Sequence, residues 1–383
     1  MLERRSFQKG KVRSLKIISI VGARPQFIKA AAISKKLQGK HEEFLLHTGQ
    51  HYDYEMSGIF FEGLDLPRPA ASLGVGSGSH GAQTGAMLEA IEGVLLKERP
   101  NYVLIYGDTN STLAGALAAA KLSVPIAHVE AGLRSYNRRM PEEINRVVAD
   151  DLSDLLLCPS ENAVRNLAVE GKRHNVHLVG DVMLDVLNWA KQRTQESGTA
   201  ILERIGVSKG NYLLATVHRS QNTDDAGPLL NILKAFNAID ETIIFPVHPR
   251  ARKAMKQIGY RPEPHVRLID PVGYLDMVAL LGAARLTLTD SGGLQKEAYW
   301  LGTPCVTLRD ETEWVETVEA GWNVLVGSDH ARILEAVCSF NPSVARPPLY
   351  GDGAAAEKCV NLLGIDREPL NLSERTEYAT WSR

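Results

Sequence analysis

The chain has 383 residues, of which 44% are hydrophobic and 23% are charged, and its net charge is −2. This length favours two domains over one, and the near-neutral charge excludes a global basic surface for nucleic acid or for an anionic membrane. No apolar window is long enough to span a bilayer, and the charged N-terminus lacks the apolar core of a signal peptide, so a cytoplasmic protein is the simplest interpretation. Four scattered cysteines without a C-x-x-C pair favour reduced core thiols over a metal site.

In the first half of the chain, short apolar runs alternate with segments of helical spacing. The run 15–21 is continuous and rich in β-branched residues, which is typical of a buried parallel strand, and Pro25 suits the first turn of the next helix. Further strands are expected at 44–48, 102–106, 125–129, 155–159 and 176–179, and further helices at 80–97, 111–121, from Pro141 and at 161–170. This alternation predicts a doubly wound parallel sheet in an N-terminal domain of residues 1–180.

The same alternation returns in the second half. Residues 182–193 have helical spacing, and 197–209 have the composition of a linker. Strands are expected at 212–217, 242–247, 266–269, 286–289, 305–308 and 324–326, and helices at 229–239, 274–284, from about Leu294 and at 330–340. The fold class predicted is therefore α/β with two doubly wound Rossmann-like domains, the second covering residues 181–352, followed by a polar tail at 367–383.

The stretch LTLTDSGGLQKEAYWLG, residues 286–302, carries a binding signal. An apolar strand runs into Ser291-Gly292-Gly293 and then into a helix, so free backbone N–H groups and the positive end of a helix dipole meet at one point. The two glycines let a phosphate approach the backbone, and Ser291 adds a hydroxyl. Glu297 lies one helical turn later, where it can take ribose hydroxyls. An ordinary strand–helix turn would look the same, so this stretch alone leaves both interpretations open.

Charged side chains follow the strand ends in both halves, where open α/β sheets bind ligands. They are Arg24, Lys29, Asp108, Glu130, His218 and Arg309. Each alone has an ordinary interpretation, such as a helix N-cap for Asp108. Glu142, in the loop region after Glu130, can likewise be only an acid at the start of a helix. Together they indicate a crevice between two domains, with an anion site on one side and carboxylates on the other. A nucleotide-sugar fits this mixture, since paired carboxylates can divide acid and base roles while cations stabilise a departing nucleotide.

Five motifs carry a resemblance to a known family. They are GARPQFIK (22–29), YGDTNSTLAG (106–115), HVEAGLRS (128–135), MPEEINR (140–146) and TDSGGLQKEA (289–298). Their order and spacing over residues 16–364 resemble the non-hydrolysing UDP-N-acetylglucosamine 2-epimerase family. This resemblance implies a two-domain glycosyltransferase-B-type fold with a crevice between the domains, a homodimer, and a C-terminal helix at about 353–364 that packs back on the first domain.

The resemblance also implies a reaction on a UDP-sugar and a role for each motif. A base removes the sugar C2 proton while UDP leaves C1, and UDP re-adds to the resulting glycal after the proton returns on the other face. No metal and no cofactor is implied. The implied catalytic residues are Asp108, Glu130, Glu142 and His218. The implied substrate and UDP contacts are Arg24, Lys29, Arg146, Ser291, Gly292, Gly293, Glu297 and Arg309.

Several segments are most similar to one branch of that family, which acts on UDP-2,3-diacetamido-2,3-dideoxyglucuronate and serves the synthesis of surface polysaccharides such as lipopolysaccharide O-antigen. Trp314 stands where the N-acetylglucosamine enzymes often carry an arginine, and Val272 and Met277 stand where they have Gln and Phe around the uracil. The carboxylate of the branch's substrate needs an extra cation. Arg138 and Arg139 are candidates, although exposed loop arginines are commonly only solvated.

The sequence leaves three other functions open. One is the plain UDP-N-acetylglucosamine 2-epimerase, which differs in the substrate that it turns over. Another is a glycosyltransferase of the same fold, and the third is a sugar-nucleotide-binding protein without activity. The set Asp108, Glu130 and Glu142 favours epimerisation over the last two, because a binding protein needs the anion site but not three carboxylates near the sugar.

Overall fold

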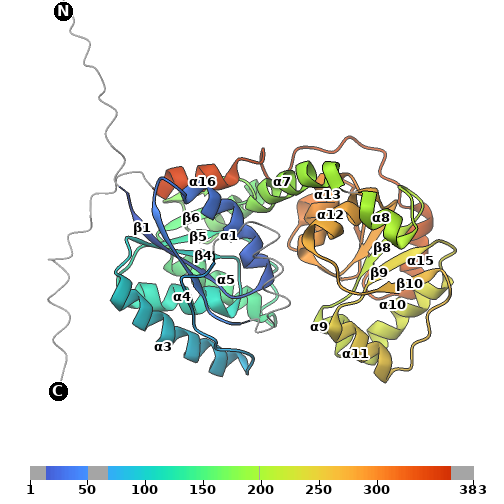
Figure 1. The fold of residues 1–383 in the computed structure, drawn as a ribbon, viewed down its shortest axis with the longest axis horizontal. Coiled ribbons are helices and arrows are strands. Elements are labelled where there is room, and N and C mark those ends of the chain that lie inside the picture. Colours follow the sequence, from blue (N-terminus) through green and yellow to red (C-terminus); the bar gives the residue numbers. More distant parts are fainter. Residues whose placement is uncertain (1–13, 51–67, 198, 364–383) are drawn as a thin grey trace, which may run out of the picture.

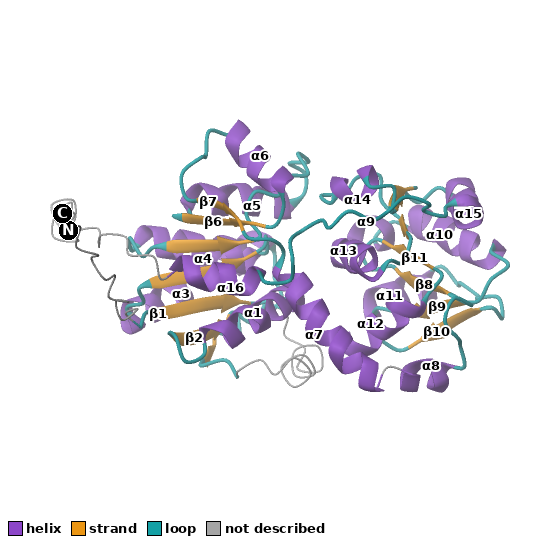
Figure 2. Ribbon diagram, turned by 90° about the horizontal axis from the view of Figure 1, so that it is seen from above, coloured by secondary structure: helices purple, strands orange, loops and turns teal. Residues whose placement is uncertain are grey.

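The computed structural model describes residues 14–50, 68–197 and 199–363, without the side chains of Arg24 and of residues 195–199. In these residues the chain forms two all-parallel sheets, one of seven strands and one of six. The predicted α/β class, with two doubly wound Rossmann-like domains, is confirmed. Figure 1 and Figure 2 show the two sheets side by side, with helices packed on the faces of each.

The first sheet has the strand order β3-β2-β1-β4-β5-β6-β7. These strands are β1 (Lys16–Val21), β2 (Glu42–His47), β3 (Ala71–Ser72), β4 (Tyr102–Tyr106), β5 (Ile126–Val129), β6 (Leu155–Cys158) and β7 (Val176–Leu178). The connecting helices are α1 (Arg24–Leu37), α3 (His80–Glu98), α4 (Asn110–Lys121), α5 (Pro141–Leu152) and α6 (Glu161–Val169). The central strands are almost completely buried, as expected for a parallel sheet covered on both faces.

The second sheet has the strand order β10-β9-β8-β11-β12-β13. These strands are β8 (Leu213–Thr216), β9 (Ile243–Pro246), β10 (Val266–Ile269), β11 (Leu286–Thr289), β12 (Cys305–Thr307) and β13 (Asn323–Leu325). The helices that follow Asp181 in the chain are α7 (Val182–Ser197), α8 (Thr199–Ile205), α9 (Ser220–Thr223), α10 (Ala226–Ala238), α11 (Pro249–Gln257), α12 (Tyr274–Ala283), α13 (Gly292–Leu301), α14 (Val315–Glu319), α15 (His330–Ser339) and α16 (Ala355–Leu363). Of these, α16 lies with the first sheet.

Each sheet reverses its strand order once, and these reversals fix where a ligand can bind. In the first sheet β1 lies beside β4, although β2 and β3 intervene in the chain. In the second sheet β8 lies beside β11, although β9 and β10 intervene. The two chain crossings diverge at such a point and leave a crevice at the carboxyl ends of the strands. The turns after β1, β4, β8 and β11 are therefore the places to examine for a site.

Two helices tie the halves together. α7 packs on α1 of the first half and on α12 of the second, and α16 returns from the end of the chain to pack on α1 and α7. Figure 1 shows α16, in red, beside the blue α1. Their apolar residues join the core under the first sheet, as Val186 and Val360 do. The carboxylate of Asp185 accepts hydrogen bonds from the backbone N–H groups of Ala355 and Ala356, at 3.1 and 3.0 Å, and so caps α16.

Some sequence expectations were wrong or incomplete. Residues 197–209 are not simply a linker, because α8 forms there and buries Ile201 against the second sheet. The short elements β3, α9 and α14 and the helix α11 were not predicted. Cys338 is exposed, whereas the other three cysteines are buried as expected. Thr109 rather than Asp108 is the N-cap of α4, and its hydroxyl accepts a hydrogen bond from the N–H of Thr112.

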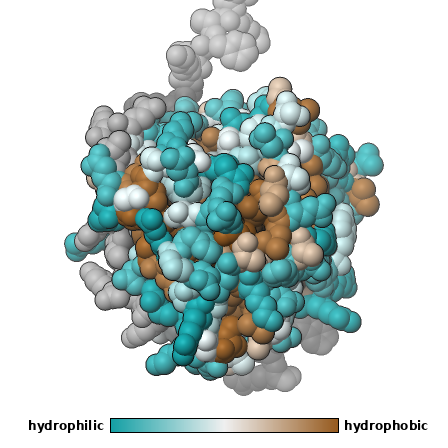
Figure 3. Space-filling model, turned by 90° about the vertical axis from the view of Figure 1, so that its right-hand side faces the viewer, coloured by the Kyte–Doolittle hydropathy of each residue, from teal (hydrophilic) through white to brown (hydrophobic). Residues whose placement is uncertain are grey.

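The surface of the second half mixes polar and apolar atoms. Figure 3 views this end of the molecule, and hydrophilic groups interrupt the hydrophobic ones across it. Leu268 and Val344 are among the exposed hydrophobic residues of this half. Among the helices of the described residues, none is both long enough and apolar enough to cross a bilayer.

Candidate active site

The turns after β1 and β4 are locked to each other. The side-chain oxygen of Gln26 accepts hydrogen bonds from the N–H groups of Gly22 and Ala23, at 2.8 and 3.0 Å. Its side-chain nitrogen donates to the carbonyl of Tyr106, at 2.9 Å, across the strand reversal. Gly22 has no room for a side chain, because an added Cβ would lie 2.1 Å from the hydroxyl of Ser111. These contacts hold the two turns at the ends of β1 and β4 in fixed positions.

Glu130 directly follows β5 and lies beside the turn after β4, since a Cβ at Gly107 would be 3.3 Å from its carboxylate. Its φ of +72° is uncommon for a residue other than glycine, and such conformations concentrate at functional sites. Lys29 forms an ion pair with it from α1, and Lys296 reaches it from α13 of the second half, with 3.1 Å between Nζ and Oε1. Burial alone raises the pKa of Glu130, but the two lysines outweigh burial and lower this pKa to about 2.

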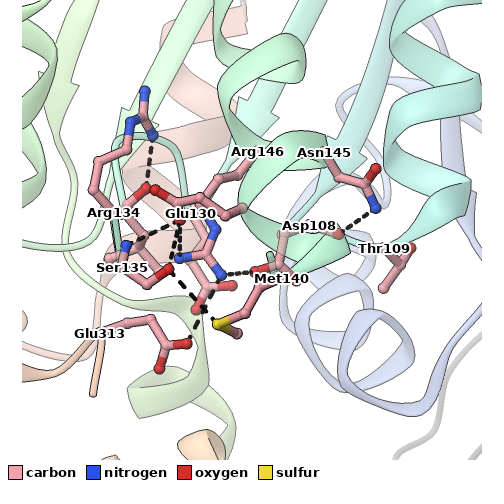
Figure 4. A network of polar contacts seen from close by, with 12 residues as sticks. Asp108, Thr109, Glu130, Arg134, Ser135, Met140, Asn145, Arg146 and Glu313 are labelled. Carbon is pink, nitrogen blue, oxygen red and sulfur yellow. Dashed lines mark hydrogen bonds and ion pairs between the residues drawn. The ribbon is translucent and has the colours of Figure 1, made fainter. Parts of the chain in front are cut away.

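A second carboxylate, Asp108, follows β4 and pairs with Arg146. The Nη2 atom of Arg146 lies 2.6 Å from Oδ2 of Asp108 (Figure 4). The same guanidinium lies 3.3 Å from Glu143 and 4.0 Å from Glu313 of the second half. Glu313 also takes a two-pronged ion pair from Arg309, at 3.1 and 3.2 Å. Although burial raises the pKa of Glu313, the two arginines lower it to about 2.

The second half contributes the turn after β11. The hydroxyl of Ser291 accepts a hydrogen bond from the N–H of Leu294 and caps α13. Asp290 is fully buried, and its carboxylate accepts hydrogen bonds from the backbone N–H groups of His218 and Arg219, at about 3.0 Å. The ring of His218 lies 3.1 Å from the same carboxylate. Burial raises the pKa of Asp290, but the bonds from His218 outweigh burial and lower it. The carboxylate thus fixes the ring beside the turn.

Gly292 is the first residue of α13, and the side chains of Trp314 and Arg219 lie next to it. A Cβ there would lie 3.3 Å from the indole nitrogen of Trp314 and 3.7 Å from Arg219. At Gly293 an added Cβ would meet no protein atom within 4 Å, so space is open beside this glycine. A helix N-terminus with open space and a neighbouring arginine suits an anion.

The two halves meet through polar contacts as well as through helices. Lys296 bonds to Glu130, Asn137 donates to Glu311 at 2.9 Å, and Ser160 donates to Glu316 at 2.6 Å. The carboxylates of the first half thereby face the anion turn of the second half. Chemically, such a crevice can hold a phosphate on one side while carboxylates move protons on the other.

Comparison with known proteins identifies the chain. The sequence profile described as UDP-N-acetylglucosamine 2-epimerase matches residues 35–364. The chain belongs to the UDP-N-acetylglucosamine 2-epimerase family. It is accordingly an isomerase, a non-hydrolysing UDP-sugar 2-epimerase.

Relatives of this epimerase cover almost the same length. A UDP-N-acetylglucosamine 2-epimerase homolog of Methanococcus maripaludis is 53% identical, over 91% of this chain and 99% of the relative. The UDP-2,3-diacetamido-2,3-dideoxy-D-glucuronate 2-epimerase of Pseudomonas aeruginosa is 50% identical, with the same coverage. The crystal structure of the Methanocaldococcus jannaschii UDP-GlcNAc 2-epimerase in complex with UDP-GlcNAc and UDP matches with a TM-score of 0.85 and 42% identity, over 92% of this chain and 99% of that one. The predicted glycosyltransferase-B-type fold is therefore confirmed.

The structure gathers most of the epimerase's predicted site residues at the crevice. These are Lys29, Asp108, Glu130, Arg146, His218, Ser291, Gly292, Gly293 and Arg309. Glu297 lies buried in α13, one turn after the anion turn. Glu142, in the first turn of α5, is half-buried. Arg24 begins α1, but its side chain lies outside the described part of the chain.

Two predicted contacts stay apart from this cluster. Arg138 and Arg139 are exposed in the loop before α5, and within the described residues neither side chain is seen in an ion pair. Arg309 and Arg146 are at the crevice but buried, and each already faces a carboxylate. The existing ion pairs of these two arginines must rearrange or be shared if they bind a substrate anion.

The sequence analysis missed three residues that organise the site. Lys296 and Asp181 form a buried ion pair with each other, and Glu313 lies between two arginines. Lys296 was visible only as one letter of the TDSGGLQKEA motif. Tyr299 and Trp300 lie three and four positions further along the helix, and a lysine beside such apolar residues is one signal that a buried partner exists. Nothing in the sequence indicated that its partners are Glu130 of the first half and Asp181 at the start of the second.

Proposed function

We propose that this epimerase inverts C2 of UDP-2,3-diacetamido-2,3-dideoxyglucuronate and forms the manno epimer for the synthesis of a surface polysaccharide such as O-antigen. The observation that carries the chemistry is the placement of Asp108 and Glu130 across the crevice from the anion turn at Gly292 and Gly293. The turn is suited to the diphosphate, and the carboxylates are suited to the sugar. We further propose a cytoplasmic homodimer with domains at 1–180 and 181–352.

The proposed reaction proceeds by elimination and re-addition. A carboxylate takes the C2 proton, the C2–H electron pair forms the C1–C2 double bond, and the C1–O bond breaks with its electrons on UDP. The glycal then takes a proton at C2 from the other face, and the β-phosphate oxygen of UDP bonds again to C1. Asp108, Glu130 and Glu142 are the proposed catalytic carboxylates, and His218 steadies the departing diphosphate. The proposed reaction requires no metal and no cofactor.

The three carboxylates differ in their surroundings, and this difference suggests a separate role for Glu130. Because two lysines hold the pKa of Glu130 at about 2, Glu130 stays ionised at neutral pH and is a weak base in this arrangement. Asp108 has a side chain that is 31% exposed and opposes a single close guanidinium. We therefore assign proton transfer to Asp108 and Glu142, and we assign to Glu130 the fixed negative charge that orients the lysines around the reacting sugar.

The uronate substrate is supported by the 50% identity to the Pseudomonas aeruginosa relative. The family resemblance of the sequence favours it as well, because that resemblance implies an arginine for the N-acetylglucosamine enzymes where this chain has Trp314. UDP-N-acetylglucosamine is the second candidate. The 42% and 43% identities to relatives that carry that name favour it, as does the Methanococcus maripaludis homolog. The sugar carboxylate would be met by Arg138 or Arg139, once their loop closes on the substrate.

The test is to give the purified protein both UDP-sugars in parallel and to compare kcat/KM. The proposal expects turnover of the diacetamido-uronate at least about 100-fold more efficient, since a site built for a charged group discriminates strongly against an analogue that lacks it. An Arg138→Gln, Arg139→Gln double variant should lose this preference mainly through KM. Equal or greater efficiency with UDP-N-acetylglucosamine would replace the uronate by the second candidate. Turnover of neither sugar would remove the proposed substrates altogether.

A further inference from the structure

Among the described residues, Lys296 is the most completely buried cation at the boundary of the two halves. It is 1% exposed and extends from α13 of the second half. Its Nζ atom pairs with Asp181, just before α7, and lies 3.1 Å from Glu130 of the first half. The ring of Trp314 lies 3.7 Å from the same atom and adds a cation–π contact. Two carboxylates and an aromatic ring thus surround this ammonium group.

We propose that Lys296 is a positioning residue, which fixes Glu130 in its place at the site only while the second half is docked against the first. The inference rests on the proposed role of Glu130 in epimerisation. Lys296 itself does not touch substrate, because its ammonium is enclosed by two carboxylates and an indole ring. Its effect on the reaction therefore passes through Glu130.

Three features distinguish this arrangement from an ordinary structural ion pair. The two partners of Lys296 come from separate segments, 115 and 166 residues away in the chain. Glu130 already has a cation in its own half, Lys29, so neutralising its charge does not require Lys296. The φ of +72° at Glu130 is also uncommon for a residue other than glycine, and such backbone conformations concentrate at functional sites.

The electrostatics support the same assignment. Burial lowers the pKa of Lys296, but Asp181 and Glu130 outweigh burial and raise it, so the ammonium stays charged. The charged and titratable groups of this cluster and of the elements around it are Lys29, Glu130, Arg146, Asp181, Asp185, Tyr350 and Cys359. When the second half moves away, Glu130 loses one of its two cations, and its pKa then rises.

The test compares Lys296→Met with the double variant Asp181→Asn, Lys296→Met. The single variant leaves Asp181 buried without a cation and is expected to be unstable. The double variant removes both charges, and Asn keeps the oxygen that accepts a hydrogen bond from the N–H of Met183, at 2.8 Å. A matched control is Lys358→Met, which removes a surface lysine paired with Asp352.

We expect the folded double variant to bind UDP like the parent but to lose kcat by about 100-fold, the order of effect that misplacing a reacting group causes. Its activity should also fall at a pH about 1–3 units higher than that of the parent when the pH is lowered. The reason is that Glu130 retains only Lys29, so its pKa rises and it is protonated more easily. Raising the pH should then restore part of the activity. The control should keep the parent's kcat and pH profile.

Two results would overturn the assignment. If the double variant regains the parent's kcat and pH profile, Lys296 serves only to neutralise Asp181. If it loses UDP binding as strongly as kcat, Lys296 contributes to binding rather than to the placement of Glu130. The parent's own turnover is measured first. A parent without activity on either UDP-sugar contradicts the proposed function and this inference with it, whereas an active parent beside an unaffected variant contradicts the inference alone.

Discussion

Asp108 combines the features that a proton-transferring carboxylate needs. It follows a strand at the reversal of the first sheet, its side chain remains 31% exposed to the crevice, and Arg146 orients it from 2.6 Å. Asn145 also donates a hydrogen bond to its backbone carbonyl, at 2.9 Å, which fixes the turn. The carboxylate is thus held in place while one side stays accessible to a sugar.

Replacing Asp108 by Asn should lower kcat by about 100-fold or more while UDP still binds, because an amide cannot take up the C2 proton. Glu142→Gln should behave alike, and Glu130→Gln should lower turnover by a comparable factor. Steady-state turnover and UDP titration measure the two quantities separately. Asp151→Asn, at an exposed position of α5, serves as the control. A near-normal kcat in Asp108→Asn or Glu142→Gln would contradict proton transfer by that residue. A near-normal kcat in Glu130→Gln would contradict the need for a fixed negative charge there.

Glu313 makes the fold sensitive to acid. Its pKa is lowered to about 2 from the ordinary 4.5, since Arg309 and Arg146 outweigh the effect of burial. A lowered pKa means that the stability contribution is fully present above the unfolded-state value and is lost as the pH falls from about 4.5 toward about 2. Glu130, with a pKa of about 2, acts in the same direction.

The unfolding free energy, measured by urea titration, should therefore fall steadily between pH 5 and pH 3. Glu313→Gln should be less stable at pH 7 but should show a flatter pH dependence, because one of the coupled carboxylates is gone. Glu319→Gln, at an exposed position of α14, should keep the parent's slope. An unchanged slope in Glu313→Gln would mean that its ion pairs with the two arginines do not contribute to stability.

Among the elements, the strand β11 and the helix α13 show how local sequence builds the anion turn. Ser291 caps the helix, and the two glycines differ in their surroundings. Gly292 lies under Trp314, whereas Gly293 faces open space. A methyl group at Gly293 therefore reports on a ligand rather than on the protein.

Gly293→Ala is expected to leave the fold intact and to weaken UDP binding by about tenfold, or about 1.4 kcal/mol, if the diphosphate lies against this turn. Isothermal titration with UDP measures the affinity, and thermal unfolding checks the fold. Gly85→Ala in α3, where an added Cβ also meets no protein atom within 4 Å, controls for the general effect of alanine in a helix. Unchanged UDP affinity in Gly293→Ala would mean that the phosphates bind elsewhere.

The elements of the sheets were predictable because their signals are local. A run such as 15–21 is apolar and short, and the glycines and prolines that follow the strands mark the turns. α8 was missed because its seven residues make fewer than two helical turns, too short a segment to show a period, although tertiary packing buries Ile201. Lys296 was missed for a different reason, since its partners depend on how the two sheets face each other.

On the level of the whole molecule, the crevice forms only when both sheets contribute to it. The turn at Asp290–Gly293 supplies an anion site, and the turns at Asp108 and Glu130 supply carboxylates. Lys296, Asn137 and the helix α7 hold these parts together. A hinge between such halves is the expected way for substrate to enter and for water to be excluded during the reaction.

Activity is expected to survive treatment with EDTA, because the proposed elimination balances without a metal. The sequence shows no ligand spacing of a metal site, and the described residues contain no group of three side chains suited to hold an ion. Turnover is measured before and after chelation, with apyrase-free buffers to protect UDP. Loss of activity that Mg²⁺ restores would contradict the proposed mechanism.

The central claim is that C2 is deprotonated and reprotonated at this crevice while UDP departs. Proton NMR in D₂O tests it most directly, with the preferred UDP-sugar as substrate and Asp108→Asn as the inactive comparison. The account predicts that the epimer forms with deuterium at C2 and that the returned substrate also gains deuterium there. Epimer formation without any deuterium at C2 would contradict removal of the C2 proton. A normal rate of deuterium exchange in Asp108→Asn would contradict the role of Asp108 in proton transfer.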